Sequence, residues 1–188
     1  SGRRGRSAEG VETVITAKVT DASGVASVIL EYQTVAPGAY VPAFLAKSTS
    51  QLNSSPNAPR TGNPAYSEPA NWTTLPMLDD GREADEVAGD DTFSVKIPGQ
   101  DNRTLVRYRI TVEDNMGVAV RLPYSDDPAL NFACFVYNGV PDYVAGTRSV
   151  LGAPHTYPAE TLTSIPVHHI IADSADFDQA VAYNSGNQ

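Results

Sequence analysis

The chain has 188 residues, of which 41% are hydrophobic and 19% charged, proportions typical of a globular protein with one full core. Its formal net charge of −9 predicts no nucleic acid partner and no anionic membrane partner, because both bind basic surfaces. No stretch approaches the roughly 20 apolar residues of a membrane span, which predicts no membrane insertion, and the single cysteine, Cys134, cannot form an internal disulfide.

The first predicted elements are two strands and a long insertion. Apolar and polar residues alternate from Val11 to Val19, which predicts a half-buried strand. Turn-forming residues at 21–24 and a second alternating run at 27–33 predict that the next strand is its antiparallel hairpin neighbour. Residues 35–70 contain six prolines, which exclude a central strand and predict an irregular insertion.

Alternation resumes after the insertion. It predicts strands at residues 72–77, 92–97, 106–113, 118–122 and 132–137. In the clearest of them, Val106 and Ile110 alternate with Arg107 and Arg109, so a single core face is expected. With about eight strands, regular turns and no helix before residue 140, the pattern predicts an all-β, immunoglobulin- or fibronectin-like β-sandwich.

Domain boundaries follow from these elements. Residues 1–10 are expected to form an N-terminal arm, residues 11–140 the sandwich, and residues 141–188 a linker, an extra strand and a polar tail. The extra strand is predicted at residues 165–171, and the tail from residue 174 onward is a candidate helix. A lone strand has to pair with the sandwich, with another domain or with another copy of the chain.

The most distinctive local feature is an acidic stretch at residues 79–91, which holds seven acidic residues and one arginine. Carboxylate oxygens on a glycine-punctuated loop are ligands that calcium prefers. The candidate calcium ligands are Asp79, Asp80, Asp85, Asp90 and Asp91. Asp and Gly also make tight turns, and solvent and salt can absorb repulsion on the order of 1 kcal/mol per exposed pair. A calcium loop and a metal-free turn therefore both stay open.

The other chemistry-bearing residues favour packing over catalysis. His168 and His169 are adjacent in a predicted strand and would face opposite sides, so they cannot easily share one ion. Cys134 lies within an alternating strand, where a small buried thiol is the usual arrangement. The sequence contains no nucleophile elbow, phosphate-binding glycine loop or catalytic carboxylate pair, so no enzymatic activity is predicted. Tyr40 and Tyr66, in the insertion, are the candidates for an exposed glycan-binding face.

Six groups of residues, in order along the chain, resemble one bacterial module: Val14–Asp21, Trp72–Met77 with Asp79–Gly81, Ala88–Asp90, Leu105–Val112, Pro123–Pro128, and Asn131–Ala133 with Phe135–Pro141. It is the immunoglobulin-like module that precedes the kinase-like domain in large surface proteins of the spore-coat CotH family, often behind a lamin-tail-like domain. The resemblance covers roughly residues 11–172.

This resemblance has two implications. Residues 165–173 resemble the opening strand of the kinase-like domain, whose nucleotide and metal ligands would lie further downstream, so the chain is not expected to phosphorylate a substrate by itself. Relatives usually carry glycine where this chain has Ala84 and Asp91, which weakens a metal site carried over from the family.

These observations predict a non-catalytic, extracellular or cell-surface module that spaces, presents or docks neighbouring domains, with calcium as its candidate cofactor. A second hypothesis makes the chain a subunit of a surface filament or other homopolymer. In it, the N-terminal arm or the strand around Val167 completes the next copy by strand addition. A third hypothesis makes the insertion a glycan-binding surface.

Overall fold

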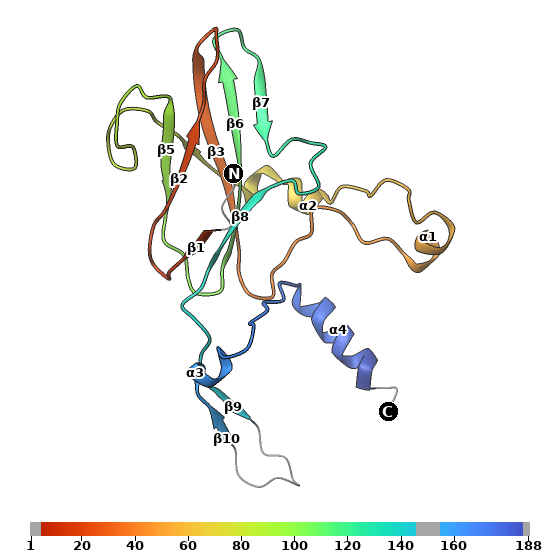
Figure 1. Ribbon diagram of the computed structural model, residues 1–188. Coiled ribbons are helices and arrows are strands. Elements are labelled where there is room, and N and C mark those ends of the chain that lie inside the picture. Colours follow the sequence, from red (N-terminus) through yellow and green to blue (C-terminus); the bar gives the residue numbers. More distant parts are fainter. Residues whose placement is uncertain (1–4, 146–154, 186–188) are drawn as a thin grey trace.

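The computed structural model of the chain describes residues 5–145 and 155–185. Strands make up most of its regular structure, which confirms the β-rich class predicted from the alternation of apolar residues. A body, residues 5–138, is followed by an extension, described at residues 139–145 and 155–185, that projects from one end of it (Figure 1). None of the described helices is long and apolar enough to cross a membrane.

The body is built on one main sheet, which has six strands within the described residues. In spatial order they are β1 (Gly5–Ser7), β8 (Phe132–Val136), β6 (Leu105–Asp114), β3 (Val25–Val35) and β4 (Thr73–Pro76), with β7 (Ala119–Leu122) beside the second half of β6. The pairing of β1 with β8 is parallel, and the other pairings are antiparallel. β3 and β6 form a long ladder, from the pair Val25 and Asp114 to the pair Val35 and Leu105.

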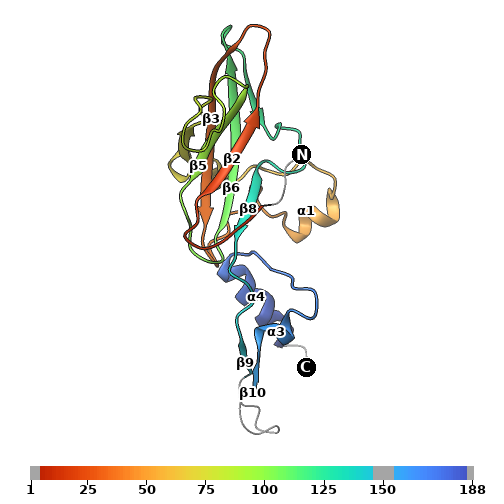
Figure 2. The ribbon, with the colours of Figure 1, turned by 60° about the vertical axis from the view of Figure 1, so that its left-hand side comes forward.

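A second sheet of two strands, β2 (Thr13–Lys18) and β5 (Thr92–Ile97), lies against the main sheet (Figure 1 and Figure 2). The predicted hairpin between the first two alternating runs is therefore wrong, because the chain crosses from one sheet to the other between β2 and β3. Asp21 shapes that crossing by accepting hydrogen bonds from the backbone N–H and the hydroxyl of Ser23. The predicted hairpin of β6 with β7 is confirmed.

Both sheets contribute to one core. Its buried members are Val28, Leu30, Met77, Ile97, Val106, Ile110, Cys134 and Val136. The side chains of β2 and β5 that pack against them are Ile15, Ala17, Phe93 and Val95. The inward face predicted for β6 is confirmed, and Cys134 is buried as expected.

The predicted irregular insertion covers the outer face of the main sheet. This fully described segment contains three short helices: α1 (Thr49–Ser54), α2 (Pro64–Ser67) and η1 (Pro69–Asn71). α2 lies against the sheet, whereas α1 lies at the end of a projecting lobe, residues 46–62 (Figure 1). The lobe closes on itself, because the Lys47 ammonium donates to the carbonyl oxygens of Pro56 at 2.7 Å and Ala58 at 2.5 Å.

The extension consists of short elements. They are β9 (Tyr143–Ala145) and β10 (His155–Tyr157), which form an antiparallel pair, α3 (Ala159–Leu162) and α4 (Ser174–Ser185). The candidate helix in the tail is present as α4, but the strand predicted at residues 165–171 is wrong, because these described residues adopt no regular structure. Pro166 lacks the N–H that a ladder needs, and β1 already occupies the edge of β8. The segment reaches the body through an isolated bridge between Ala39 and Asp173.

Shortening Leu30 tests the position of the core. Leu30→Ala is expected to lower the free energy of unfolding by about 2–5 kcal/mol, because it empties a fully enclosed site. Leu52→Ala is the matched control, since Leu52 on α1 is 52% exposed and should change stability by less than about 0.5 kcal/mol. Urea unfolding measures both variants, and equal losses would contradict the assignment of the core.

Candidate functional site

The acidic loop, residues 79–91, carries the chain from β4 in the main sheet to β5 in the second sheet. It begins directly after an isolated bridge between Leu78 and Ser94, which exchange backbone hydrogen bonds of 3.0 and 2.8 Å. At the other end of the loop, the Asp91 carbonyl oxygen accepts a hydrogen bond from the Val19 N–H at 2.9 Å. The loop therefore lies at the seam between the two sheets.

Asp79 organises this loop by accepting backbone N–H groups. Its Oδ1 accepts from Gly89 at 2.6 Å and from Asp90 at 3.3 Å. Its Oδ2 accepts from Asp91 at 2.9 Å. These bonds fold the end of the loop back onto its beginning, as the metal-free turn interpretation expects.

Backbone conformation explains part of the loop's composition. Gly81 has a φ of 69°, and a Cβ there would approach the backbone nitrogen of Ala88 to 3.0 Å. A side chain at this position is therefore disfavoured both by the backbone conformation and by the lack of space. Asp85, which is 7% exposed, accepts a hydrogen bond from the Gly81 N–H at 2.6 Å. Asp91 also has a positive φ, 66°, a backbone conformation that aspartate tolerates better than most residues other than glycine.

Three of the five predicted calcium ligands come together. Carboxylate oxygens of Asp79, Asp85 and Asp90 lie within 4.8 Å of one another, whereas Asp80 and Asp91 are outside this group. Calcium takes about six to eight oxygen ligands, so backbone carbonyls and water would have to supply the rest. Ligand type and spacing fit a hard cation, and the backbone hydrogen bonds explain the shape of the loop without one.

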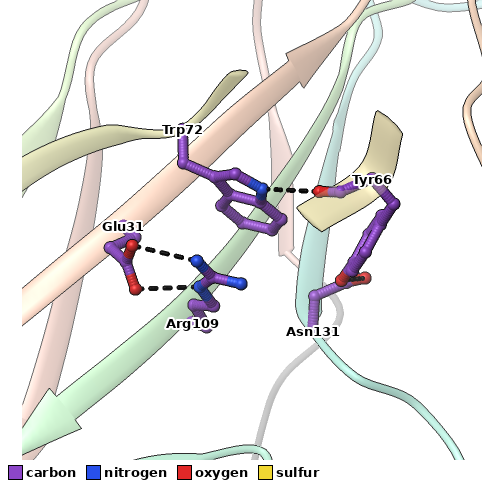
Figure 3. A network of polar contacts seen from close by, with 5 residues as sticks. All are labelled: Glu31, Tyr66, Trp72, Arg109 and Asn131. Atoms are coloured by element: carbon purple, nitrogen blue, oxygen red, sulfur yellow. Dashed lines mark hydrogen bonds and ion pairs between the residues drawn. The ribbon is translucent and has the colours of Figure 1, made fainter. Parts of the chain in front are cut away.

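Arginine and aromatic side chains form a cluster beneath the insertion, on the outer face of the main sheet (Figure 3). Arg109 of β6 and Glu31 of β3 are direct cross-strand partners. They form a two-pronged ion pair, with Nε to Oε2 at 2.8 Å and Nη2 to Oε1 at 2.9 Å. The guanidinium also lies 4.1 Å from the centre of the Trp72 ring. The hydrogen bond from Arg109 holds the pKa of the Glu31 carboxyl below its usual value.

Tyr66 and Trp72 fasten α2 to the sheet (Figure 3). The Trp72 indole N–H donates to the Tyr66 carbonyl oxygen at 2.8 Å, and the two rings pack edge to face with centres 5.5 Å apart. The Tyr66 hydroxyl donates to Asn131 Oδ1 at 2.9 Å. Because Tyr66 is only 4% exposed, the prediction that its ring offers an open glycan-binding face is wrong. The insertion uses this ring for its own packing.

Arg107 is the member of the cluster that sequence reasoning missed. It is 3% exposed, and its guanidinium donates to the Val41 carbonyl oxygen at 2.7 Å and to the side-chain oxygen of Gln33. The centres of the Tyr40 and Tyr66 rings lie 5.3 and 5.0 Å from it. Its Nε has no hydrogen-bond partner in the described part of the chain, and burial lowers the pKa of Arg107. The two ring faces offset part of the cost of burying its charge.

One signal for this burial is present in the sequence. The non-core face predicted for β6 carries two arginines, and the neighbouring insertion supplies tyrosines and ends at a tryptophan. Aromatic faces attract guanidinium groups, so the two sets are natural partners. The pairing of individual residues is not visible from this pattern, because it depends on how the insertion folds over the sheet.

His169 and Cys134 have structural roles. The His169 ring centre lies 4.4 Å from that of Tyr137 and 5.1 Å from that of Phe135, so His169 packs on the body as expected, although from an irregular segment. Burial raises the pKa of the Cys134 thiol, which lowers its reactivity.

A cavity of about 560 Å³ lies where the extension meets the body. Phe135 of the body and Phe177 of α4 contribute apolar walls, and Arg103 and Asp173 contribute charges of opposite sign. This mixed lining does not select one class of ligand, so the cavity adds no candidate chemistry to the acidic loop.

No family model, no curated protein and no solved structure matches this chain. Functional inference therefore rests on the residues themselves. Among them, the acidic loop fits a cation, and the arginine and aromatic cluster fits the attachment of the insertion.

A thermal melt of the full chain tests the calcium interpretation. Millimolar calcium is expected to raise the melting temperature relative to a chelator, because an ion that binds only the folded state stabilises it by mass action. Asp85→Asn keeps an acceptor for the Gly81 N–H but removes the charge, so it should abolish the rise. Asp126→Asn, at an exposed acid outside the loop, is the control. An unchanged melting temperature in the unsubstituted chain would identify a metal-free turn.

The pH dependence of stability tests the ion pair of Glu31. Since the folded-state pKa of Glu31 is lowered from 4.5, the pair stabilises the fold above that pH and is lost as pH falls through the folded value. Glu31→Gln should lower stability near pH 7 and reduce the loss between about pH 7 and pH 3. Glu113→Gln, at an exposed position of β6, is the control. Denaturant unfolding at both pH values measures the effect, and an unaltered pH dependence would refute it.

Proposed function

We propose that the chain is a non-catalytic, extracellular or cell-surface module that spaces, presents or docks neighbouring domains. The observation that carries the proposal is the contrast between the body and the extension. In the body, apolar side chains of both sheets share one core. The exposed apolar residues of the extension, each at least 39% exposed, include Ile165, Val167, Ile170, Ile171, Phe177 and Val181. Apolar surface of this density marks a contact with another protein.

An immunoglobulin- or fibronectin-like sandwich is the fold that we propose for the body. Its support is the packing of β2 and β5 over the core that β3, β6 and β8 share. The chain crosses between the sheets four times, on either side of β2 and on either side of β5, and the acidic loop is one of these crossings. Two packed sheets, mainly antiparallel and joined by such crossings, are typical of this class of sandwich.

The family resemblance supplies the cellular setting of the proposal. Its segments Leu105–Val112 and Trp72–Met77 coincide with β6 and β4, and its acidic segment begins the loop at the seam of the sheets. In that family the module precedes a kinase-like domain on a surface protein. The neighbour that the extension would contact is therefore a domain of this kind.

Calcium enters the proposal as a stiffening ligand. An ion held by Asp79, Asp85 and Asp90 would join the beginning, middle and end of the acidic loop. Because the loop links the two sheets, the ion would restrict their movement relative to each other. Such rigidity suits a module that holds its neighbours at a fixed separation.

The two alternative functions have less support. Filament formation by strand addition needs a terminal strand that leaves its own chain, whereas β1 pairs with β8 of the same chain. Glycan binding through the insertion needs open aromatic faces, whereas Tyr66 is buried and the Tyr40 ring lies near Arg107. Spacing and docking need neither a terminal strand that leaves its own chain nor an open aromatic face.

Cross-linking on intact cells that express the natural protein tests the proposal. A water-soluble carbodiimide joins carboxylates to the lysines that they contact. Asp176 and Asp178 of α4 are expected to cross-link to lysines of a neighbouring domain, because they flank the exposed apolar residues. The carboxylates of the acidic loop are the internal control, since most are exposed but lie in the body. Cross-links solely between copies of this chain would favour a filament, and none from the extension would contradict docking.

A further inference from the structure

β1 and β8 are the parallel neighbours of the main sheet, and their pairing continues beyond the strands. Gly5, Arg6 and Ser7 lie in register with Cys134, Phe135 and Val136. The Tyr137 N–H then donates to the Ser7 carbonyl oxygen at 2.9 Å. The first described residues of the chain are therefore attached along the last strand of the body.

Side-chain bonds extend this attachment. The Glu9 N–H donates to Asn138 Oδ1 at 2.9 Å, and Asn138 Nδ2 donates back to Glu9 Oε2 at 2.6 Å. The Gly10 N–H also donates a hydrogen bond, to the Gln100 carbonyl oxygen at 3.0 Å. A Cβ at Gly99 would lie 2.3 Å from the Gly10 carbonyl, so the two backbones are in direct contact. We call residues 5–10, with their partners at 99–100 and 134–138, the N-terminal clasp.

The parallel direction of β1 and β8 decides how the clasp responds to tension. The chain enters β1 at one end of the pair and leaves β8 at the opposite end, toward the extension (Figure 1). Force on the two ends of the chain therefore pulls the strands in opposite directions along their own axes. All the hydrogen bonds between them then carry the force together. In a hairpin pulled at its open ends, the bonds break one after another.

β8 transmits this force to the whole body. It pairs antiparallel with β6, from Leu105 beside Phe135 to Tyr108 beside Phe132. Its inward side chains belong to the buried core, so β8 cannot be drawn out without opening that core. The extension is held less firmly, by bonds such as that from the Ser174 N–H to the Gly38 carbonyl oxygen at 2.9 Å, and would detach first.

We propose that the N-terminal clasp resists tension, so that the body stays folded when neighbouring domains pull on both of its ends. The inference rests on the proposed spacing function, because only a module attached at both ends carries tension. Under force the lifetime of the module depends on its unfolding rate. That rate is set by the bonds that lie across the line of force, and these are the bonds of the clasp.

Single-molecule force spectroscopy of the full chain, held by tags at its two ends, tests the proposal. Light scattering first establishes that the protein is monomeric, so that β1 pairs within its own chain. The trace is expected to show small early lengthening as the extension detaches. A single high-force peak should follow, which lengthens the tether by roughly 400 Å at about 3.5 Å per released residue.

Two changes are expected to remove the mechanical resistance of the clasp in different ways. Asn138→Ala removes both side-chain bonds to Glu9 and is expected to lower the peak force. Moving the N-terminal handle to residue 11, through Val11→Cys, leaves the clasp intact but pulls it from the end next to Gly10, so that its bonds break one after another and the high-force peak should be lost. Val11 is 54% exposed and Cys134 is buried, so one thiol reacts.

Asn115→Ala is the matched control. Asn115 also joins two segments, since its Nδ2 donates to the Ser23 carbonyl oxygen at 2.8 Å, but it lies outside the clasp. This variant should keep the full peak force even if urea unfolding shows the same loss of stability as for Asn138→Ala.

Gradual lengthening at low force, or equal effects of Asn138→Ala and Asn115→Ala on the peak, would overturn the role of the clasp. Either result leaves the proposed docking function standing, because cross-linking on cells measures contact without tension. An intact high-force peak without cross-links from the extension would overturn docking alone.

Discussion

The antiparallel ladder of β3 and β6 is the element on which the rest of the structure depends. Its inner face supplies Leu30 and Ile110 to the core that the second sheet covers. Its outer face supplies the ion pair of Glu31 with Arg109, and Arg107 beside it, which hold the insertion. Because side chains alternate along a strand, a register shift of one residue would exchange these two faces. One ladder thus positions both layers around it.

Sequence patterns predict the positions of strands in this chain more successfully than they predict which strands pair with each other. The alternation at residues 106–113 identifies β6 and its core face, because both follow from residues that are neighbours in the chain. The turn at residues 21–24 suggests a local hairpin, yet β3 pairs with β6, whose apolar face lies far along the chain. An apolar run such as residues 165–171 forms a strand only where a sheet edge is free, and β1 occupies the edge of β8.

The candidate sites show the same difference between features formed by neighbouring residues and contacts between distant segments. The acidic loop is visible in the sequence because its residues are contiguous, but the convergence of three carboxylates depends on the turns that Asp79 forms. The burial of Arg107 is harder to predict, because Gln33 and Val41 reach it from different segments. Alternation places this arginine away from the core. Only the fold of the insertion turns that position into an enclosed one.

The projecting lobe of the insertion also shows where the molecule can accommodate change. Tyr66 and Trp72 make the attachment to the sheet, whereas the lobe is closed by Lys47 and by the reciprocal capping bonds of Ser48 and Gln51. The core and the clasp therefore do not depend on the tip of the lobe. A longer or foreign segment inserted near Asn53 would change the outline of the protein without disturbing its architecture. For protein engineering, this lobe is therefore a site where a segment can be added while the rest of the fold is kept.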